Sequence, residues 1–460
     1  MKSSLKFKDL GGDFFAHVKT QKLENTTLIH INENLKQELN LKVTDKDLLR
    51  ICSGEKQLAK ESPISSVYAG HQFGYFVPQL GDGRSCLIGE VGGYELSLKG
   101  AGTSPFSRGA DGRAVLRSSI REYLCSIAMQ GLNIPTTKAL SIVSSNSQVY
   151  REHIENAAIV TRVAESHIRF GHFEYFASKG QDENVKKLAD FVLQHHMPEL
   201  DQRDYLGLFK NVIHLTAIMI ARWQAQGFSH GVMNTDNMSI LGLTIDYGPF
   251  SFMEIYDPGF ICNHSDTQGR YSFERQPSVA LWNLQRLADA LRSLIQEDQL
   301  KEALSFYEKI LVKEYSNLMR SKFGLILQDE DDNSLINNFL KLLYTNKKDY
   351  HRSMRQLLSQ QQNTLGDEFD SWFKDYQKRL NKEENLTQSL ALMSQVNPKY
   401  ILRNYLAEVA IRKAEDLNEY DEIDILFKLL EKPFDNHDGY ESYDSEAPDW
   451  AKNLELSCSS

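Results

Sequence analysis

A short polar segment between two apolar ones constrains this chain most. Asn234-Thr-Asp-Asn237 follows an apolar pattern over residues 211–228 and precedes the apolar run 238–245, which ends at Asp246. The apolar residues of 211–228 occupy most of the circumference of a helix, which is typical of a buried helix. A buried helix that leads directly into a polar loop is a scaffold for a site, so the loop is predicted to lie in a cleft.

The residues after this loop predict a hairpin. Leu241-Gly242 fits a two-residue turn, and the register would then place Asn237 opposite Asp246, with Asp236 beside them. Directly paired side chains lie about 5 Å apart. Two oxygen ligands beside a free carboxylate suit a Mg²⁺ ion that keeps open positions. A polar turn whose side chains cap backbone groups fits the same residues, and both interpretations stay open at this point.

Glycines and cations precede this region by more than a hundred residues. Gly81 and Gly83 let the backbone approach an anion, and Arg84 adds a charged fork. Residues 86–91 and 94–99 then predict a strand, a tight turn and a strand. Most short glycine pairs are only turns, so this signal is weak alone.

The next segment, 99–113, is rich in glycine and bounded by cations, with Lys99 at its start and Asp111 and Gly112 near its end. Backbone N–H groups in such a segment predict a phosphate cradle.

A helix is predicted over 114–130, with Glu122 off its apolar stripe. Glu122 is therefore expected either to pair with a cation across a cleft or to face solvent. Arg162 lies inside an apolar strand, and Arg169 follows seven residues later. Buried cations are costly unless paired, which favours an anion ligand or an internal ion pair.

Composition limits the other possibilities. The 460 residues include 41% hydrophobic and 25% charged residues, and the net charge is −10, so no nucleic-acid partner is expected. No apolar run reaches the length of a membrane span, and the first residues lack the features of a signal or transit peptide. We expect a cytoplasmic monomer without membrane contact. None of the five cysteines forms a C-x-x-C pair, which argues against zinc.

The chain divides into four expected segments. Residues 1–60 are an extension of mixed character, 61–180 hold the nucleotide-binding elements, 181–430 are mainly helical, and 431–460 form an acidic, flexible tail that carries Cys458. Further predictions are a hairpin over 138–143 and 148–152, helices within 184–228, a polar loop over 257–270 and helices from 278 to 430.

The order of these parts is that of a protein kinase: glycine-rich turn, strand lysine, helix glutamate, catalytic Asp, metal-binding Asn and a second Asp before glycine. One departure is that Asp236 and Asn237 are adjacent, whereas kinases space them five apart. Phosphorylation of hydroxyls is therefore in doubt, although binding of ATP with Mg²⁺ survives the change.

Several long motifs resemble the selenoprotein O family, also called SelO or YdiU. They run in order through most of the chain, as far as Asn397-Pro-Lys-Tyr-Ile-Leu-Arg-Asn404 and the terminal cysteine. The most specific ones are Tyr68-Ala-Gly-His-Gln-Phe-Gly74, Gln79-Leu-Gly-Asp-Gly-Arg84, Leu98-Lys-Gly-Ala-Gly102, Asp111-Gly-Arg-Ala-Val-Leu-Arg-Ser-Ser-Ile-Arg-Glu122, His167-Ile-Arg-Phe-Gly-His-Phe-Glu-Tyr175 and His230-Gly-Val-Met-Asn-Thr-Asp-Asn-Met-Ser-Ile240.

The resemblance implies a two-lobed, protein-kinase-like α+β fold that transfers AMP from ATP to Ser, Thr or Tyr hydroxyls of proteins, with ATP reversed relative to kinases. UMP transfer supported by Mn²⁺ is a further implied activity. Asp236 would accept the proton, and Asn237 and Asp246 would bind Mg²⁺. The resemblance assigns the nucleotide to Gly81, Gly83, Arg84, Lys99, Asp111, Gly112, Arg162, Arg169 and Asp246, with Glu122 orienting Lys99.

Two alternatives accompany this interpretation: an inactive ATP-binding scaffold and a protein kinase. A redox role is also expected, in which Cys458 forms a disulfide with Cys262 and gates activity. The protein substrates, the acceptor residue and the physiological metal do not follow from the sequence.

Overall fold

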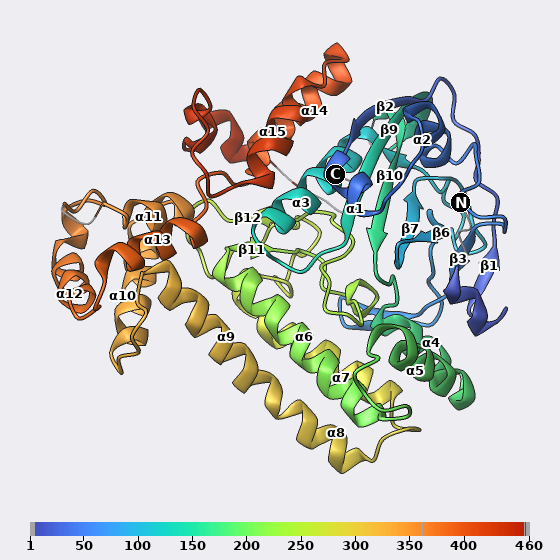
Figure 1. The fold of residues 1–460 in the computed structure, drawn as a ribbon, viewed down its shortest axis with the longest axis horizontal. Coiled ribbons are helices and arrows are strands. Elements are labelled where there is room, and N and C mark those ends of the chain that lie inside the picture. The colour runs from blue at the N-terminus through green and yellow to red at the C-terminus, as the bar shows by residue number, and fades with distance from the viewer. Residues whose placement is uncertain (1–4, 152, 360–361, 455, 457–460) are drawn as a thin grey trace.

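The computed structural model describes residues 5–151, 153–359, 362–454 and 456. A β-sheet occupies one side of the molecule and long helices occupy the other (Figure 1). The predicted α+β class is therefore confirmed. In this described part of the chain, no helix combines the length and apolar character needed to cross a membrane.

The main sheet has eight strands, and its pairings are antiparallel. Seven strands follow the order β1-β3-β6-β7-β10-β9-β2, and β8 pairs with β10. Two short hairpins lie outside it, β4 (Gly70–Gln72) with β5 (Tyr75–Val77) and β11 (Phe228–Ser229) with β12 (Ser251–Phe252). The strands of the main sheet are β1 (Phe15–His17), β2 (Thr27–Ile31), β3 (Ile64–Ser66), β6 (Ser85–Val91), β7 (Tyr94–Lys99), β8 (Ala114–Val115), β9 (Lys138–Tyr150) and β10 (Ile154–Ala164).

The hairpin predicted from 138–143 and 148–152 is wrong. Residues 138–150 form one long strand, β9, which pairs with β10 through two register shifts, and residue 152 lies outside the described residues. The polar residues 144–147 are typical of a turn, but the Ser145 hydroxyl donates to the Ala157 carbonyl at 3.0 Å and keeps this stretch beside β10. Within residues 5–60, β1 and β2 are strands of this sheet.

The alternating pattern of β7 places its two faces against different neighbours. Leu96 and Leu98 belong to an apolar cluster with Leu35 of α1 (Glu33–Glu38) and Leu48 of α2 (Asp45–Cys52). The other face of the sheet is covered by α3 (Leu116–Gly131), which packs on β9 and β10. Lys99 therefore lies on the face that α3 covers, because side chains alternate along a strand.

The helical part begins with α4 (Phe170–Ser178) and α5 (Asp182–His196). The region predicted as helical over 184–228 breaks near Pro198, because proline cannot continue a helix. Beyond the break, α6 (Tyr205–Ala225) is buried as predicted and packs against the long α9. The remaining helices are α7 (Gln276–Ala290), α8 (Glu297–Leu304), α9 (Phe306–Lys322), α10 (Asp332–Thr345), α11 (Tyr350–Gln356), α12 (Asp370–Leu380), α13 (Leu386–Val396), α14 (Asn404–Arg412) and α15 (Asp421–Glu431).

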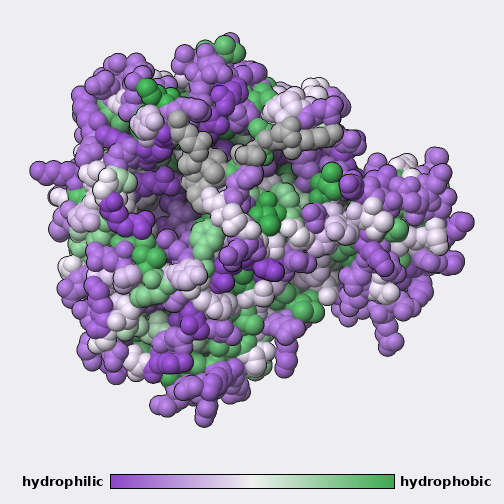
Figure 2. Space-filling view, turned by 180° about the vertical axis from the view of Figure 1, so that it is seen from behind, coloured by the Kyte–Doolittle hydropathy of each residue, from purple (hydrophilic) through white to green (hydrophobic). Residues whose placement is uncertain are grey.

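Helices α10 to α13 pack on the end of α9 around their own apolar cluster. They form a separate, predominantly hydrophilic knob on the surface (Figure 2). Helix α15 packs instead on α3, near the sheet. The acidic segment that follows α15 packs against α14. The Tyr405 hydroxyl of α14 lies 3.3 Å from the Ser445 hydroxyl, and the Tyr405 ring packs against Trp450.

Candidate functional site

A cleft of about 590 Å³ lies where the glycine-rich turns of the sheet meet the loop that precedes β12. Two predicted site residues, Glu122 and Arg162, are buried and do not line it. The structure gathers all the other predicted site residues in this one cleft: Gly81, Gly83, Arg84, Lys99, Asp111, Gly112, Arg169, Asp236, Asn237 and Asp246.

Glu122 joins two cations beneath the cleft. Strand register explains the contact, because Arg162 on β10 lies opposite Ser97, two residues before Lys99 on β7. All three side chains therefore share one face of the sheet, and α3 carries Glu122 over it. Glu122 accepts hydrogen bonds from Lys99 Nζ and from Arg162, whose second contact measures 3.0 Å. Of the two outcomes left open for Glu122, an ion pair or exposure to solvent, the structure shows the ion pair.

Burial and ion pairing together determine the charge states of Lys99 and Glu122. Burial lowers the pKa of Lys99 to about 8, although the Glu122 carboxylate opposes that shift. For Glu122, burial alone would raise the pKa, but Arg162 and Lys99 hold it below its ordinary value. The carboxylate is therefore ionised at neutral pH and fixes the lysine ammonium at the cleft wall.

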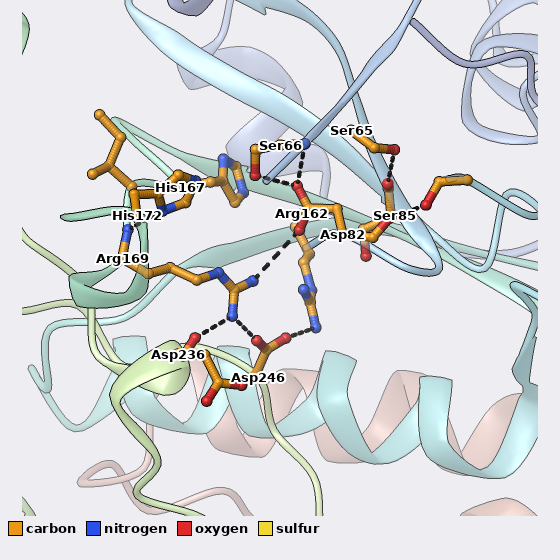
Figure 3. Close-up of polar contacts among 12 residues, drawn as sticks. Ser65, Ser66, Asp82, Ser85, Arg162, His167, Arg169, His172, Asp236 and Asp246 are labelled. Carbon is orange, nitrogen blue, oxygen red and sulfur yellow. Dashed lines mark hydrogen bonds and ion pairs between the residues drawn. The ribbon is translucent and has the colours of Figure 1, made fainter. Parts of the chain in front are cut away.

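Arginines also hold Asp246 (Figure 3). Its Oδ1 lies 2.7 Å from Arg162, and its Oδ2 accepts a hydrogen bond from Arg169. Arg169 also donates to the backbone carbonyl of Asp236 at 2.7 Å, and its guanidinium lies over the Tyr68 ring. Burial would raise the pKa of Asp246, but Arg169 and Arg162 hold it well below its usual value. Asp246 is thus an ionised carboxylate across the working range of pH.

The pKa of Asp236 is shifted in the opposite direction to that of Asp246. Its exposed fraction is 7%, its Oδ2 accepts from Gln72 at 3.1 Å, and its Oδ1 is buried without a hydrogen-bond partner. Burial raises the pKa of this carboxyl to about 6. Gly70 permits the close packing, since a Cβ there would lie 2.6 Å from Oδ1. A carboxylate with an unused oxygen and a pKa near neutrality suits a proton acceptor.

The hairpin predicted over 238–245 is wrong. This segment pairs with distant chain instead: Ser239 bridges to Arg169 and Thr244 to Thr136. These partners provide the backbone hydrogen bonds that a local hairpin would have provided. Asn237 and Asp246 still line the same cleft, although they are not a paired position of a ladder.

The donor set fits a hard divalent cation. Asn237 Nδ2 donates to the Val232 carbonyl at 2.9 Å, which leaves the amide oxygen as the atom able to bind a cation. Asp246 supplies a carboxylate. Over the described ranges there is no cluster of three or more His, Cys, Asp or Glu side chains that could hold a metal. A Mg²⁺ ion needs no such cluster, because one or two protein oxygens, substrate phosphates and water complete its octahedron.

The outer rim of the cleft combines glycine and arginine. Gly112 has a φ of +67°, and a Cβ there would lie 2.2 Å from the Gly102 carbonyl group, so the two loop segments touch through backbone. Asp111 forms a two-point ion pair with Arg151, at 2.7 and 2.9 Å. Arg84 is exposed, and its side chain makes no hydrogen bond or ion pair with any described residue, so its guanidinium is available to a ligand.

Several site residues escaped the sequence analysis. Gln72 holds Asp236, Tyr68 lies under Arg169, and the hydroxyl of Tyr271 donates to Asn234 at 2.6 Å. The density of glycine and aromatic residues in 68–74 was a signal for the first two. No local pattern indicates Tyr271, which reaches the loop from the polar segment before α7.

One predicted contact cannot be placed. Cys262 is buried, and its thiol lies 3.3 Å from the Ser229 hydroxyl. Cys458 lies outside the described residues, so the predicted disulfide stays a prediction.

The geometry of the cleft defines a class of protein. The cleft combines a lysine fixed by a buried glutamate, the unpaired guanidinium of Arg84 at its rim and hard oxygen donors. This combination suits a polyanion carried with a divalent ion, as in nucleotide-dependent transferases.

Sequence comparisons give the family. Residues 1–432 match the family described as protein adenylyltransferase SelO. The chain is 46% identical to protein nucleotidyltransferase YdiU of Vibrio vulnificus strain CMCP6, over 100% of this chain and 99% of that protein. It is 50% identical to the protein of the same name from Thioalkalivibrio sulfidiphilus, over 89% and 88% of the two chains. The chain therefore belongs to the SelO family.

Proposed function

We propose that this chain transfers AMP from ATP to Ser, Thr or Tyr hydroxyls of other proteins and releases diphosphate. One observation carries the proposal: Asp236, a carboxylate with an unpartnered oxygen, shares a cleft with Asp246, Asn237 and the unpaired guanidinium of Arg84. Membership of a family described as a protein adenylyltransferase supports AMP as the transferred group.

In the proposed reaction, Asp236 accepts the proton of the acceptor hydroxyl. The hydroxyl oxygen forms a bond to the α-phosphorus, the bond from that phosphorus to the bridging oxygen breaks, and diphosphate leaves with the bond electrons. A pKa of about 6 makes Asp236 mostly ionised at neutral pH while keeping it a usable base.

Asn237 and Asp246 would hold Mg²⁺ or Mn²⁺. A bound divalent ion supplies charge neutralisation for the phosphates. Arg162 and Arg169 keep Asp246 ionised and oriented toward the cleft. These contacts prepare the carboxylate without filling the cleft.

The nucleotide would be bound by other residues of the cleft and by Arg162, which is buried beneath it; the cleft residues are Gly81, Gly83, Arg84, Lys99, Asp111, Gly112 and Arg169. Glu122 would orient Lys99, as their ion pair supports. A lysine on a strand paired with a glutamate on a helix is also the arrangement of protein kinases. We therefore include a kinase-like division into a nucleotide-binding lobe over 61–180 and a mainly helical lobe over 181–430 in the proposal.

The position of the label in ATP tests this function. A protein acceptor mixture is incubated with the enzyme, a divalent ion and ATP labelled at either the α- or the γ-phosphate. We expect label in protein only from the α-position, and α-labelled UTP tests UMP transfer in parallel. Label from the γ-position alone would identify a kinase. Transfer that persists unchanged in Asp246→Ala would contradict the assigned site.

A further inference from the structure

A second pocket adjoins the nucleotide cleft. Its volume is about 560 Å³, and it lies between the β4–β5 hairpin and the beginning of α7. Phe73 borders both cavities. Its walls include Phe73 and Tyr75 on the hairpin side, and Arg270, Arg275 and Trp282 on the other. We call this cavity the arginine pocket.

The hairpin connects the arginine pocket to the proposed catalytic base. Gln72 donates to the Asp236 carboxylate at 3.1 Å. The next residue, Phe73, donates its backbone N–H to Asn234 at 3.2 Å and contacts the Tyr271 hydroxyl at 3.0 Å. A peptide residue adds about 3.3 Å when extended. A side chain a few residues from a hydroxyl at Asp236 can therefore reach this pocket.

The chemistry of the pocket selects negative charge. It is lined by two arginines and by no aspartate or glutamate, in a chain whose net charge is −10. Neither Arg270 nor Arg275 has an ion-pair partner anywhere in the described ranges, and Arg270 Nε is buried without a hydrogen-bond partner. Arg275 donates one hydrogen bond, from Nη1 to the Gly269 carbonyl at 3.3 Å, which positions its guanidinium without neutralising it. Two guanidinium groups without a carboxylate partner at one cavity are a recognition site for a carboxylate.

An aromatic contact fixes the position of the Arg270 guanidinium. The Arg270 guanidinium carbon lies 4.7 Å from the centre of the Trp282 ring and packs over Gly74. Stacking fixes the plane of a guanidinium and leaves its N–H groups free to donate. At the rim, Tyr75 is 80% exposed, which provides an apolar surface for the backbone of a bound peptide.

We propose that the arginine pocket binds an aspartate or glutamate side chain of the protein acceptor, close in sequence to the hydroxyl that receives AMP. The inference rests on the proposed function and names its substrate class: proteins whose acceptor hydroxyl lies near an acidic residue. Arg270 and Arg275 supply the charge, and the β4–β5 hairpin sets the spacing between the two positions.

Synthetic peptides test this specificity. Each contains one tyrosine in a neutral sequence and one glutamate, glutamine or lysine that is moved stepwise along both sides of the tyrosine. We expect the glutamate peptide to be modified at least about tenfold more efficiently than its glutamine counterpart at the favoured spacing, since a hydrogen bond to a charged group contributes about that factor. The difference is expected in KM more than in kcat.

Variants assign the preference to the pocket. In Arg270→Gln, and again in Arg275→Gln, the ratio of glutamate to glutamine efficiency should fall toward one. Arg286→Gln is the matched control, because Arg286 also lies over Trp282, at 5.1 Å, but pairs with Asp289 and does not line the pocket. Arg270→Glu should invert the preference toward the lysine peptide. A merely structural role for Arg270 would not produce that inversion.

Binding without turnover separates this inference from the proposed function. Fluorescence anisotropy of labelled glutamate and glutamine peptides is measured on the full chain without ATP. Tighter binding of the glutamate peptide that Arg270→Gln removes supports the pocket even if no AMP is transferred, which would count against the proposed function alone. Equal binding and equal modification of the two peptides at every spacing would refute the arginine pocket while leaving AMP transfer standing.

Discussion

Replacing Asp236 by asparagine should stabilise the fold while it slows the reaction. Burial raises the pKa of Asp236 from its ordinary 3.8 to about 6. The folded protein therefore binds this proton more tightly than the unfolded chain, and stability contributed by the group falls as pH rises from 3.8 through 6. A shift of about 2 units corresponds to about 3 kcal/mol of unfavourable free energy in the ionised state.

Asparagine keeps the shape and removes the charge. Its side chain can still accept from Gln72, but an amide N–H then takes the place of the unpartnered oxygen, which costs about 1 kcal/mol. We expect Asp236→Asn to be more stable than the parent by about 2 kcal/mol above pH 6, with the difference shrinking as pH falls toward 4. The rate of transfer should drop by about 10²–10⁴, because the general base is lost.

Urea unfolding of both proteins at a series of pH values measures this directly. The parent and Asp236→Asn share every other titrating group, so the difference in unfolding free energy isolates Asp236. In the active enzyme, kcat/KM should rise through pH 6 and then level off. An Asp236→Asn protein that is no more stable than the parent, with a difference independent of pH, would refute the account of a desolvated carboxylate.

Three further predictions address the supporting residues. Glu122→Gln should lower the free energy of unfolding by about 3–5 kcal/mol, since it leaves Lys99 and Arg162 buried without their carboxylate; urea titration that shows no loss would contradict the pairing. Gly112→Ala should lower the melting temperature and weaken ATP binding, because its Cβ would overlap the Gly102 backbone; calorimetry with unchanged values would count against that close packing. Burial lowers the pKa of Lys322 to about 7, so the free energy of unfolding should rise with pH between 7 and the ordinary pKa of 10.5. Urea unfolding of the parent and of Lys322→Met should show this rise in the parent alone.

The sequence predicted the parts of the site that lie within single motifs. Gly81, Gly83 and Arg84 form one turn, and Asp236 with Asn237 forms another, so their proximity follows from the chain itself. Resemblance to a family then placed these turns on one cleft. The structure agrees, since all five residues line the same cavity.

Contacts between distant segments could not be predicted in this way. Glu122 was left open between solvent and an ion pair, because the outcome depends on the β7–β10 register that puts Arg162 opposite Ser97. The hairpin over 238–245 was wrong for the same reason: Thr136 and Arg169 supply pairing partners that no local rule includes.

The arginine pocket is also formed by contacts between segments that lie far apart in the sequence. Phe73 and Arg270 lie about 200 residues apart in the chain and line one cavity only because the β4–β5 hairpin reaches the segment before α7. Phe73 lies in the glycine- and aromatic-rich segment 68–74, but no sequence pattern connects that segment to Arg270. Specificity of this kind has to be found from the fold.

The orientation of the nucleotide tests the central claim most directly. A crystal structure with a non-hydrolysable ATP analogue and Mg²⁺ should place the α-phosphorus beside Asp236 and the metal between Asn237 and Asp246. The terminal phosphate beside Asp236, with the base buried as in a kinase, would contradict the claim. So would a metal that contacts neither Asn237 nor Asp246.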